Sequence, residues 1–288
     1  MPTRTALLDT NAVMELKGDE KAAAKSNGWR LTTTPWSFFE RLCHLEDQAD
    51  FARARGQLMQ FRGIEIVDKP LDRLVAARQA SDKPRIWGSH LSYAMLAAAD
   101  AASSLDALYR SVIVDEAGQH RVIRDCADRI KGILDKEELR FQQLVTSIIK
   151  VLHSGQVAAA SGSEQHQAIL DMVASGESSF PDTPDLDYQN GATPGEMLAL
   201  TYVYHAYTFL RGLAKGNAIG NTCAKNDFED GQICAYVPLS QEIWVITGDG
   251  PLFETLSKTR SLLATVGMDK SAFFMPAGKD NLLQGGAS

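Results

Sequence analysis

Paired cysteines are missing from this sequence. Its 288 residues contain four cysteines, at positions 43, 126, 223 and 234, and no two of them form a Cys-x-x-Cys pair. Structural zinc sites and redox-active dithiols usually need such closely spaced thiols, so we expect neither of them here. Scattered thiols of this kind are typical of small buried residues.

Long hydrophobic runs are missing as well. No apolar stretch approaches the ~20 residues that a membrane-spanning helix needs. The first residues, MPTRTALLDTNAV, have neither the apolar core nor the small-residue cleavage pattern of a signal peptide. These absences predict a cytoplasmic protein that does not use a membrane as a partner.

Positive charge is not in excess. The chain has 29 Lys and Arg against 36 Asp and Glu, which gives a formal net charge of −7. Tight binding to long duplex DNA without sequence preference usually requires a basic surface, so this function is disfavoured. Bound metal would neutralise part of the acidic excess, and a local basic stripe remains compatible with it.

The sequence does contain an alternation of buried strands and helices. Hydrophobic residues make up 44% of the chain, which is enough for a sizeable core. Short apolar runs that end in polar residues predict parallel strands, and amphipathic stretches between them predict crossover helices. The predicted strands are residues 5–8, 29–33, 64–67, 242–247 and 271–276. We therefore predict an α/β fold with a parallel sheet flanked by helices.

The middle of the chain has a different texture, because Ala- and Leu-rich helical patterns dominate between residues 70 and 215. We expect 70–215 to be a large all-helical insertion between a first part of the core, 1–69, and a second part, 216–288. Arg85 and Lys225 lie near the ends of the insertion and are candidates for contact with substrate phosphate. The alternative is that these two are ordinary surface cations.

Four acidic residues occupy positions where a parallel sheet would gather them. Asp9 closes the first strand, and Asp249 closes the strand at 242–247. Ligands of open α/β sheets bind outside the carboxyl ends of the strands, where such residues can meet. Glu40 lies in the helix that follows the second strand, and Asp230 lies in the first turn of a later predicted helix. We therefore predict that the four carboxylates converge on one site.

Clustered carboxylates favour one kind of chemistry. They repel one another unless cations join them, and hard oxygen ligands suit Mg²⁺ or Mn²⁺. Such ions lower the pKa of a bound water and stabilise the leaving oxygen of a phosphodiester. No competing motif is present, since GxSxG and HExxH are absent and GLAKGNAIG departs from the phosphate-binding GxxxxGK[ST].

In their order along the chain, these motifs resemble those of PIN-domain nucleases. The matching segments are LLDTN at 7–11, TPWSFFE at 34–40, DGQICA at 230–235 and VITGD at 245–249. The resemblance implies a PIN-like fold and a nuclease that uses water and Mg²⁺ or Mn²⁺ to cut RNA, or sometimes DNA. The implied catalytic, metal-binding acids are Asp9, Glu40, Asp230 and Asp249. Two residues have implied supporting roles, with Asn11 orienting the first acid and Thr247 lying near the fourth.

Some alternatives stay open. Asp227 lies close to the third acidic position; the spacing of Asp230 to Ile233 and Ala235 favours Asp230, with Asp227 as a helix cap or a supporting residue. Each acid taken alone also has a simpler explanation, as a turn residue after a strand or as a solvated helix residue.

The function has an alternative in another class. A catalytically weak PIN-like fold could act as a binding or assembly module, with a protein partner or a second copy of the chain on the helical insertion. A toxin of a toxin–antitoxin pair, a phage-defence effector and a housekeeping ribonuclease would all share the predicted chemistry, so the sequence leaves the biological context open.

Overall fold

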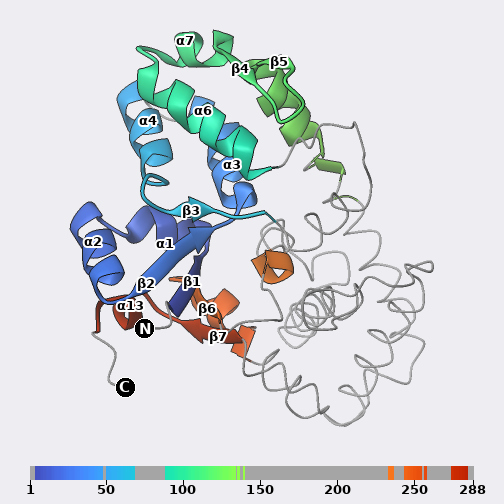
Figure 1. The fold of residues 1–288 in the computed structure, drawn as a ribbon. Coiled ribbons are helices and arrows are strands. Elements are labelled where there is room, and N and C mark those ends of the chain that lie inside the picture. Colours follow the sequence, from blue (N-terminus) through green and yellow to red (C-terminus); the bar gives the residue numbers. More distant parts are fainter. Residues whose placement is uncertain are drawn as a thin grey trace, which may run out of the picture. The chain divides into compact units, whose positions relative to one another are not determined.

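The chain divides into two compact units. In the computed structural model, the first comprises Met1–Leu134, Ile243–Gly250 and Pro276–Ser288, and the second comprises Asp135–Glu242 and Pro251–Met275. The residues that the structure describes are 4–47, 50–68, 88–133, 135–136, 139, 233–236, 243–254, 256–257 and 274–284. Most of them belong to the first unit. Figure 1 shows their helices and strands, coloured along the sequence.

A five-stranded sheet forms the centre of the described fold, in the order β3-β2-β1-β6-β7. The strands are β1 (Arg4–Leu8), β2 (Trp29–Thr33), β3 (Glu65–Ile66), β6 (Ile243–Ile246) and β7 (Phe274–Ala277). Strands β3, β2, β1 and β6 run parallel. The predicted parallel sheet with flanking helices is therefore confirmed.

The direction in which strands are added reverses at β1. From β1 the chain adds β2 and then β3 on one side, and it returns much later to add β6 on the other side of β1. In β1 every residue after Arg4 is buried, as expected for a strand that is covered on both faces. Open α/β sheets bind their ligands at the carboxyl ends of the strands beside such a reversal, which here lies between β1 and β6.

Helices in the first part of the chain begin at residues that satisfy their free N–H groups. Helix α3 (Pro35–Cys43) begins after Thr34, whose hydroxyl accepts a hydrogen bond from the Ser37 N–H, and this confirms the predicted cap and first-turn proline. Helix α4 (Phe51–Met59) is capped in the same way by Asp50. The other helical elements here are α1 (Thr10–Glu15), α2 (Gly18–Ser26), a 3-10 helix at Leu45–Asp47 and α13 (Asp280–Leu283).

The described part of the predicted helical insertion is mostly helical. Helix α6 spans Ser89–Ala101, α7 spans Leu105–Arg110, and residues 123–133 are also helical. Buried side chains from this stretch join the same core cluster as those of α3 and α4. The predicted limits of the insertion, near residues 70 and 215, lie outside the described residues.

One hairpin corrects the prediction that this segment is all-helical. Strands β4 (Val112–Val114) and β5 (His120–Val122) pair antiparallel. Three consecutive β-branched residues make up β4, and such residues favour a strand over a helix. Gly118, with φ of 74°, then provides the left-handed backbone that the turn between them needs.

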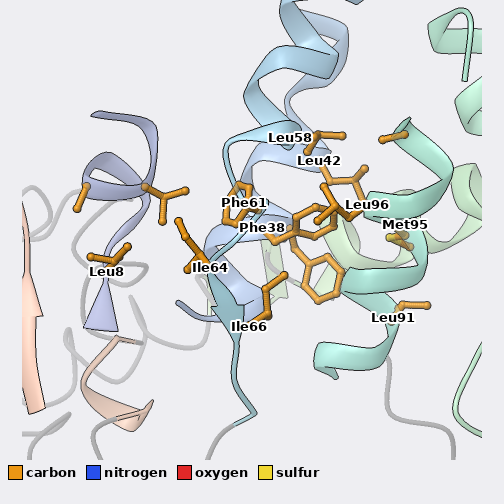
Figure 2. Close-up of a cluster of buried hydrophobic side chains, with 14 of the residues drawn as sticks. Leu8, Phe38, Leu42, Leu58, Phe61, Ile64, Ile66, Leu91, Met95 and Leu96 are labelled. Carbon is orange, nitrogen blue, oxygen red and sulfur yellow. The ribbon is translucent and has the colours of Figure 1, made fainter. Parts of the chain in front are cut away.

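A continuous hydrophobic core joins the sheet to α3, α4 and α6 (Figure 2). Phe38 and Leu42 from α3, Leu58 from α4 and Met95 from α6 are fully buried. The ring of Phe38 also meets Phe61 edge to face, with 5.3 Å between ring centres. Burial of each such side chain contributes about 1.5–3 kcal/mol, so this packing fixes which face of α3 points inward.

The second unit is described over a few short stretches. Ile233–Tyr236 forms a 3-10 helix, in a segment where the sequence predicts an α-helix opened by Asp227. Residues 251–254 are helical, as predicted. Across the part of the chain that the structure describes, no helix combines the length and the apolar character needed to cross a membrane.

Candidate functional site

Three parallel strands bring acidic residues to one edge of the sheet. Asp9 follows β1 directly, Glu40 lies in α3 after β2, and Asp249 comes shortly after β6. Because these strands run parallel, their carboxyl ends lie at the same edge. Asp9 and Asp249 follow the two strands between which the strand order reverses, where an α/β sheet binds its ligand.

Asp9 is held between the sheet and the first helix. It is the N-cap of α1, and its Oδ1 accepts a hydrogen bond of 2.5 Å from the Ala12 N–H. Its own N–H donates to the Ile246 carbonyl of β6 at 3.1 Å. The side chain has one further partner, because Oδ2 accepts from the Thr247 hydroxyl. With 7% of its surface exposed, Asp9 has little freedom to reorient.

Thr247 connects the two strand-end acids. Its hydroxyl donates to Asp9 and accepts a hydrogen bond of 2.9 Å from the Asp249 N–H. Its backbone N–H donates to the Ala277 carbonyl in β7 at 3.0 Å, which fixes the residue to the sheet. A single buried hydroxyl thus sets the position of the Asp9 carboxylate relative to the backbone of Asp249.

The pKa of Asp9 is raised from 3.8 to about 6. Burial is the main cause, and the negative charges of Asp249 and Glu15 act in the same direction. The hydrogen bonds from Thr247 and from the Ala12 N–H oppose this shift because they favour the ionised form. The ionised carboxylate therefore lies in surroundings that disfavour its charge, and a nearby cation would relieve this.

Glu40 is linked to the same edge through Thr10. The Thr10 hydroxyl donates a hydrogen bond of 2.7 Å to Oε2 of Glu40. Thr10 is the first residue of α1 and follows Asp9 in the chain. Glu40 itself is half-buried, on the side of α3 that faces away from the core residues Phe38 and Leu42. This hydrogen bond links α1, which follows β1, to the Glu40 carboxylate of α3, which follows β2.

Glu15 is an acid of this edge that the sequence reasoning missed. It ends α1, and its carboxylate lies so close to Gly248 that a Cβ added to that glycine would be 3.0 Å from Glu15 Oε1. Its charge also acts on Asp9. Glu15 follows Asp9 by six positions, at the end of the helix that Asp9 caps. Only the structure shows that it lies against Gly248.

The remaining predicted residues divide into two groups. Asn11 lies in the first turn of α1 and is exposed, and the hydrogen bonds that orient Asp9 come from Ala12 and Thr247. Thr247 lies next to the fourth acid, as the resemblance implies, and in addition bonds the first. The other predicted site residues lie outside the described residues, and they are Arg85, Lys225, Asp227 and Asp230.

Comparisons with known proteins do not assign the chain to a family. No family model matches it, and no curated protein or solved structure gives a significant match. An interpretation of the site therefore depends on its own geometry and charge.

The donor set suits a divalent cation in chemical type. Asp9 and Asp249 supply hard oxygen atoms, and the charge of Asp249 acts on Asp9, while Glu15 and Glu40 lie at the same edge. Among the described residues, no three side chains of the metal-binding types come close enough to hold one ion together. The resemblance assigns the next ligand to Asp230, which the structure does not describe. The residues present thus fit a cation by donor type, and the raised pKa of Asp9 agrees with this.

Proposed function

We propose that this protein is a PIN-like, metal-dependent nuclease that hydrolyses phosphodiester bonds, with RNA as the favoured substrate. The observation that carries the proposal is the Thr247 hydroxyl at the reversal of strand order, which donates to the Asp9 carboxylate and accepts from the backbone N–H of Asp249. A parallel α/β sheet binds its ligand at this point. Acidic residues there supply the oxygen ligands that a divalent metal ion prefers.

Charge supports the same proposal. Burial and the charges of Asp249 and Glu15 raise the pKa of Asp9 to about 6, although the residue is bonded to donors that favour its ionised form. A buried carboxylate surrounded by like charges is a common feature of sites that bind cations or perform catalysis. The motif order of the sequence, with an acid after the first strand and another after the last parallel strand, agrees with a PIN-like arrangement.

The implied cofactor is Mg²⁺ or Mn²⁺, which Asp9, Glu40 and Asp249 would hold together with Asp230. When bound, the ion supplies positive charge for the phosphate and lowers the pKa of a water. The protein supplies orientation. The Ala12 N–H and the Thr247 hydroxyl fix Asp9.

Glu40 has an equivalent support in the Thr10 hydroxyl. Carboxylates that are held in place before the substrate binds need little rearrangement during the reaction, which is an advantage of preorganised sites. The reaction itself is hydrolysis, in which a water adds to phosphorus and the bond from phosphorus to the leaving oxygen breaks.

A cleavage assay tests the proposal. Labelled single-stranded RNA and DNA of one sequence are incubated with the full chain in Mg²⁺, in Mn²⁺ and in EDTA. The Asp249→Asn variant, which removes one acid without changing its size, is compared with Asp19→Asn, which changes an exposed acid on α2. We expect metal-dependent cleavage that falls roughly a thousandfold in Asp249→Asn, equivalent to ~4 kcal/mol, and is unchanged in Asp19→Asn.

Two outcomes would count against the proposal. Equal cleavage by Asp249→Asn and by the unaltered chain would place the chemistry away from this edge. Binding of RNA with no cleavage under any metal would favour the alternative of a binding or assembly module.

A further inference from the structure

Gly248 separates Thr247 from Asp249 in the segment that follows β6, and its backbone does not require a glycine. Among the described glycines, it is not one of the three that have a positive φ. A Cβ added at Gly248 would nevertheless lie 3.0 Å from Oε1 and 3.1 Å from Oε2 of Glu15. Heavy atoms in contact normally lie about 3.5–4 Å apart, so the Glu15 carboxylate occupies space that a side chain would need.

This space borders the two acids that follow β1 and β6. Gly248 is joined on one side to Thr247, whose hydroxyl donates to the Asp9 carboxylate, and on the other side to Asp249, whose N–H donates to that hydroxyl. The charge of Glu15 also acts on Asp9, in the same direction as the charge of Asp249. Glu15 thus adds a further negative charge near Asp9, and like charges repel unless a cation joins them.

The spacing of these acids indicates how Glu15 can act on a cation. Among the described residues, no three side chains of the metal-binding types come close enough to hold one ion together, so Glu15 does not complete a direct ligand set with Asp9 and Asp249. Mg²⁺ loses its waters reluctantly and keeps several of them when it binds to a protein. A carboxylate beyond direct reach of the ion accepts hydrogen bonds from those waters and attracts the ion through its charge.

We propose that Glu15 binds the hydrated cation of the site through water, with its carboxylate held beside Gly248 to accept hydrogen bonds from the waters of the ion. This inference rests on the proposed metal-dependent function, and it adds to the site a residue that the motif resemblance does not assign. It also explains the glycine at 248, because a side chain there would displace the Glu15 carboxylate.

Cation affinity tests this inference independently of cleavage. Binding of Mn²⁺ to the full chain is measured by electron paramagnetic resonance at pH 7.5, where Asp9, with a pKa of about 6, is ionised. Glu15→Gln keeps the size of the side chain and removes its charge. It should weaken Mn²⁺ binding about tenfold, as substitution of an outer residue at a metal site does. Glu15→Asp keeps the charge on a shorter side chain and should recover part of the affinity.

Gly248→Ala reaches the same carboxylate by another route. The added carbon would meet the end of a flexible side chain, so the fold should be retained while the Glu15 carboxylate moves away. We expect the affinity for Mn²⁺ to fall about as much as in Glu15→Gln. In the Glu15→Gln background, Gly248→Ala should weaken binding by less than about twofold more, because the charge that it displaces is already absent.

Controls separate a local contact from general charge and from folding. Asp19→Asn removes one negative charge from an exposed position on α2, and it should leave the affinity for Mn²⁺ unchanged. Urea denaturation in EDTA checks that Glu15→Gln and Gly248→Ala stay folded. A merely structural role of Glu15 would appear there as lost stability without metal, whereas the proposed role appears as lost affinity alone.

The outcomes distinguish this inference from the function on which it rests. If the unaltered chain binds Mn²⁺ and cleaves RNA, and Glu15→Gln binds Mn²⁺ as tightly, Glu15 is not part of the cation site and the nuclease proposal stands. Equal weakening by Asp19→Asn and Glu15→Gln, or full affinity in Gly248→Ala, would also overturn the inference, since the effect would not come from a carboxylate beside Gly248. If the unaltered chain neither binds Mn²⁺ nor cleaves nucleic acid, both proposals are wrong.

Discussion

The two ends of the central sheet have opposite chemistry. At the amino end, the guanidinium of Arg4 lies 5.7 Å from the centre of the Trp29 ring, and Trp29 meets Trp244 edge to face at 5.3 Å. These residues stand at or near the beginnings of β1, β2 and β6. At the carboxyl end of the same strands, the charges of Asp9 and Asp249 act against each other.

The difference indicates which end stabilises the fold and which end is the candidate functional site. The contacts at the amino end are attractive, since a cation over an aromatic face and edge-to-face rings both lower the energy of the folded state. The carboxyl end holds a buried acid whose charge is disfavoured by its surroundings. Such an arrangement is unfavourable for the protein alone and becomes favourable when a ligand supplies positive charge.

The largest expected effect concerns the amino end. Trp29→Ala should lower the free energy of unfolding by about 3–5 kcal/mol, because it removes a side chain that is 3% exposed and its contact with Trp244. Urea denaturation measures this. Trp29→Phe is the matched control, since it keeps an aromatic ring there and should lose much less. A loss below about 1 kcal/mol in Trp29→Ala would show that the amino end does not stabilise the sheet.

The next-largest effect is expected at the carboxyl end of the sheet, where a substitution should raise the free energy of unfolding. The folded state holds the proton of Asp9 more tightly than the unfolded state does, because its pKa is about 6 when folded and near 3.8 when unfolded. The stability gained from this proton is complete below about pH 4 and is lost as the pH rises through 6. Asp9→Asn keeps a good helix cap and removes the charge, so we expect it to raise the free energy of unfolding at neutral pH by about 1–3 kcal/mol without metal.

Urea denaturation between pH 4 and pH 8, with and without Mg²⁺, measures this effect. The variant should show a flatter dependence on pH across the range from 3.8 to about 6. Mg²⁺ should stabilise the unaltered chain more than Asp9→Asn. A variant that is less stable than the unaltered chain at pH 7 in EDTA would mean that the ionised Asp9 is already compensated.

A smaller effect, on cleavage activity, is expected from removing the hydrogen bond that Thr10 donates to Glu40. Thr10→Val removes the hydroxyl that bonds Glu40 at 2.7 Å but keeps the branched shape of the side chain. We expect cleavage of RNA to fall about tenfold, equivalent to ~1.4 kcal/mol, with stability nearly unchanged. Thr10→Ser retains the hydroxyl and should retain activity. Full activity in Thr10→Val would show that Glu40 needs no support from α1.

The smallest effect concerns Glu15. Its charge contributes to the raised pKa of Asp9, though less than burial does. Glu15→Gln should therefore lower the pKa of Asp9 by a fraction of a unit, which a titration of the Asp9 side-chain carbon by NMR can follow. Glu20→Gln, which changes an acid of α2, is the control and should leave that pKa in place. A rise in the pKa of Asp9 in Glu15→Gln would contradict the placement of Glu15 beside it.

Much of the core could be predicted from the sequence because its signals are local. Trp29–Thr33 combines a tryptophan, a leucine and two β-branched threonines with one charged residue, Arg30, and the strand is found at those residues. Thr34 followed by Pro35 marks the start of α3 because a cap and a first-turn proline act within one turn. The β4–β5 hairpin was missed because three β-branched residues are too short a run to outweigh the helical pattern around them.

By itself the sequence determined where β1 and β6 end to within a residue or so, because apolar residues give way to polar ones at Asp9 and at Thr247. Only the tertiary structure decided what those residues do to each other. The pairing of β1 with β6 joins segments more than two hundred positions apart, and it lets the Thr247 hydroxyl bond both the Asp9 carboxylate and the Asp249 backbone N–H. It likewise places Glu15 against Gly248. Burial and long-range contact, which raise the pKa of Asp9, depend on how distant segments pack, and no local pattern contains them.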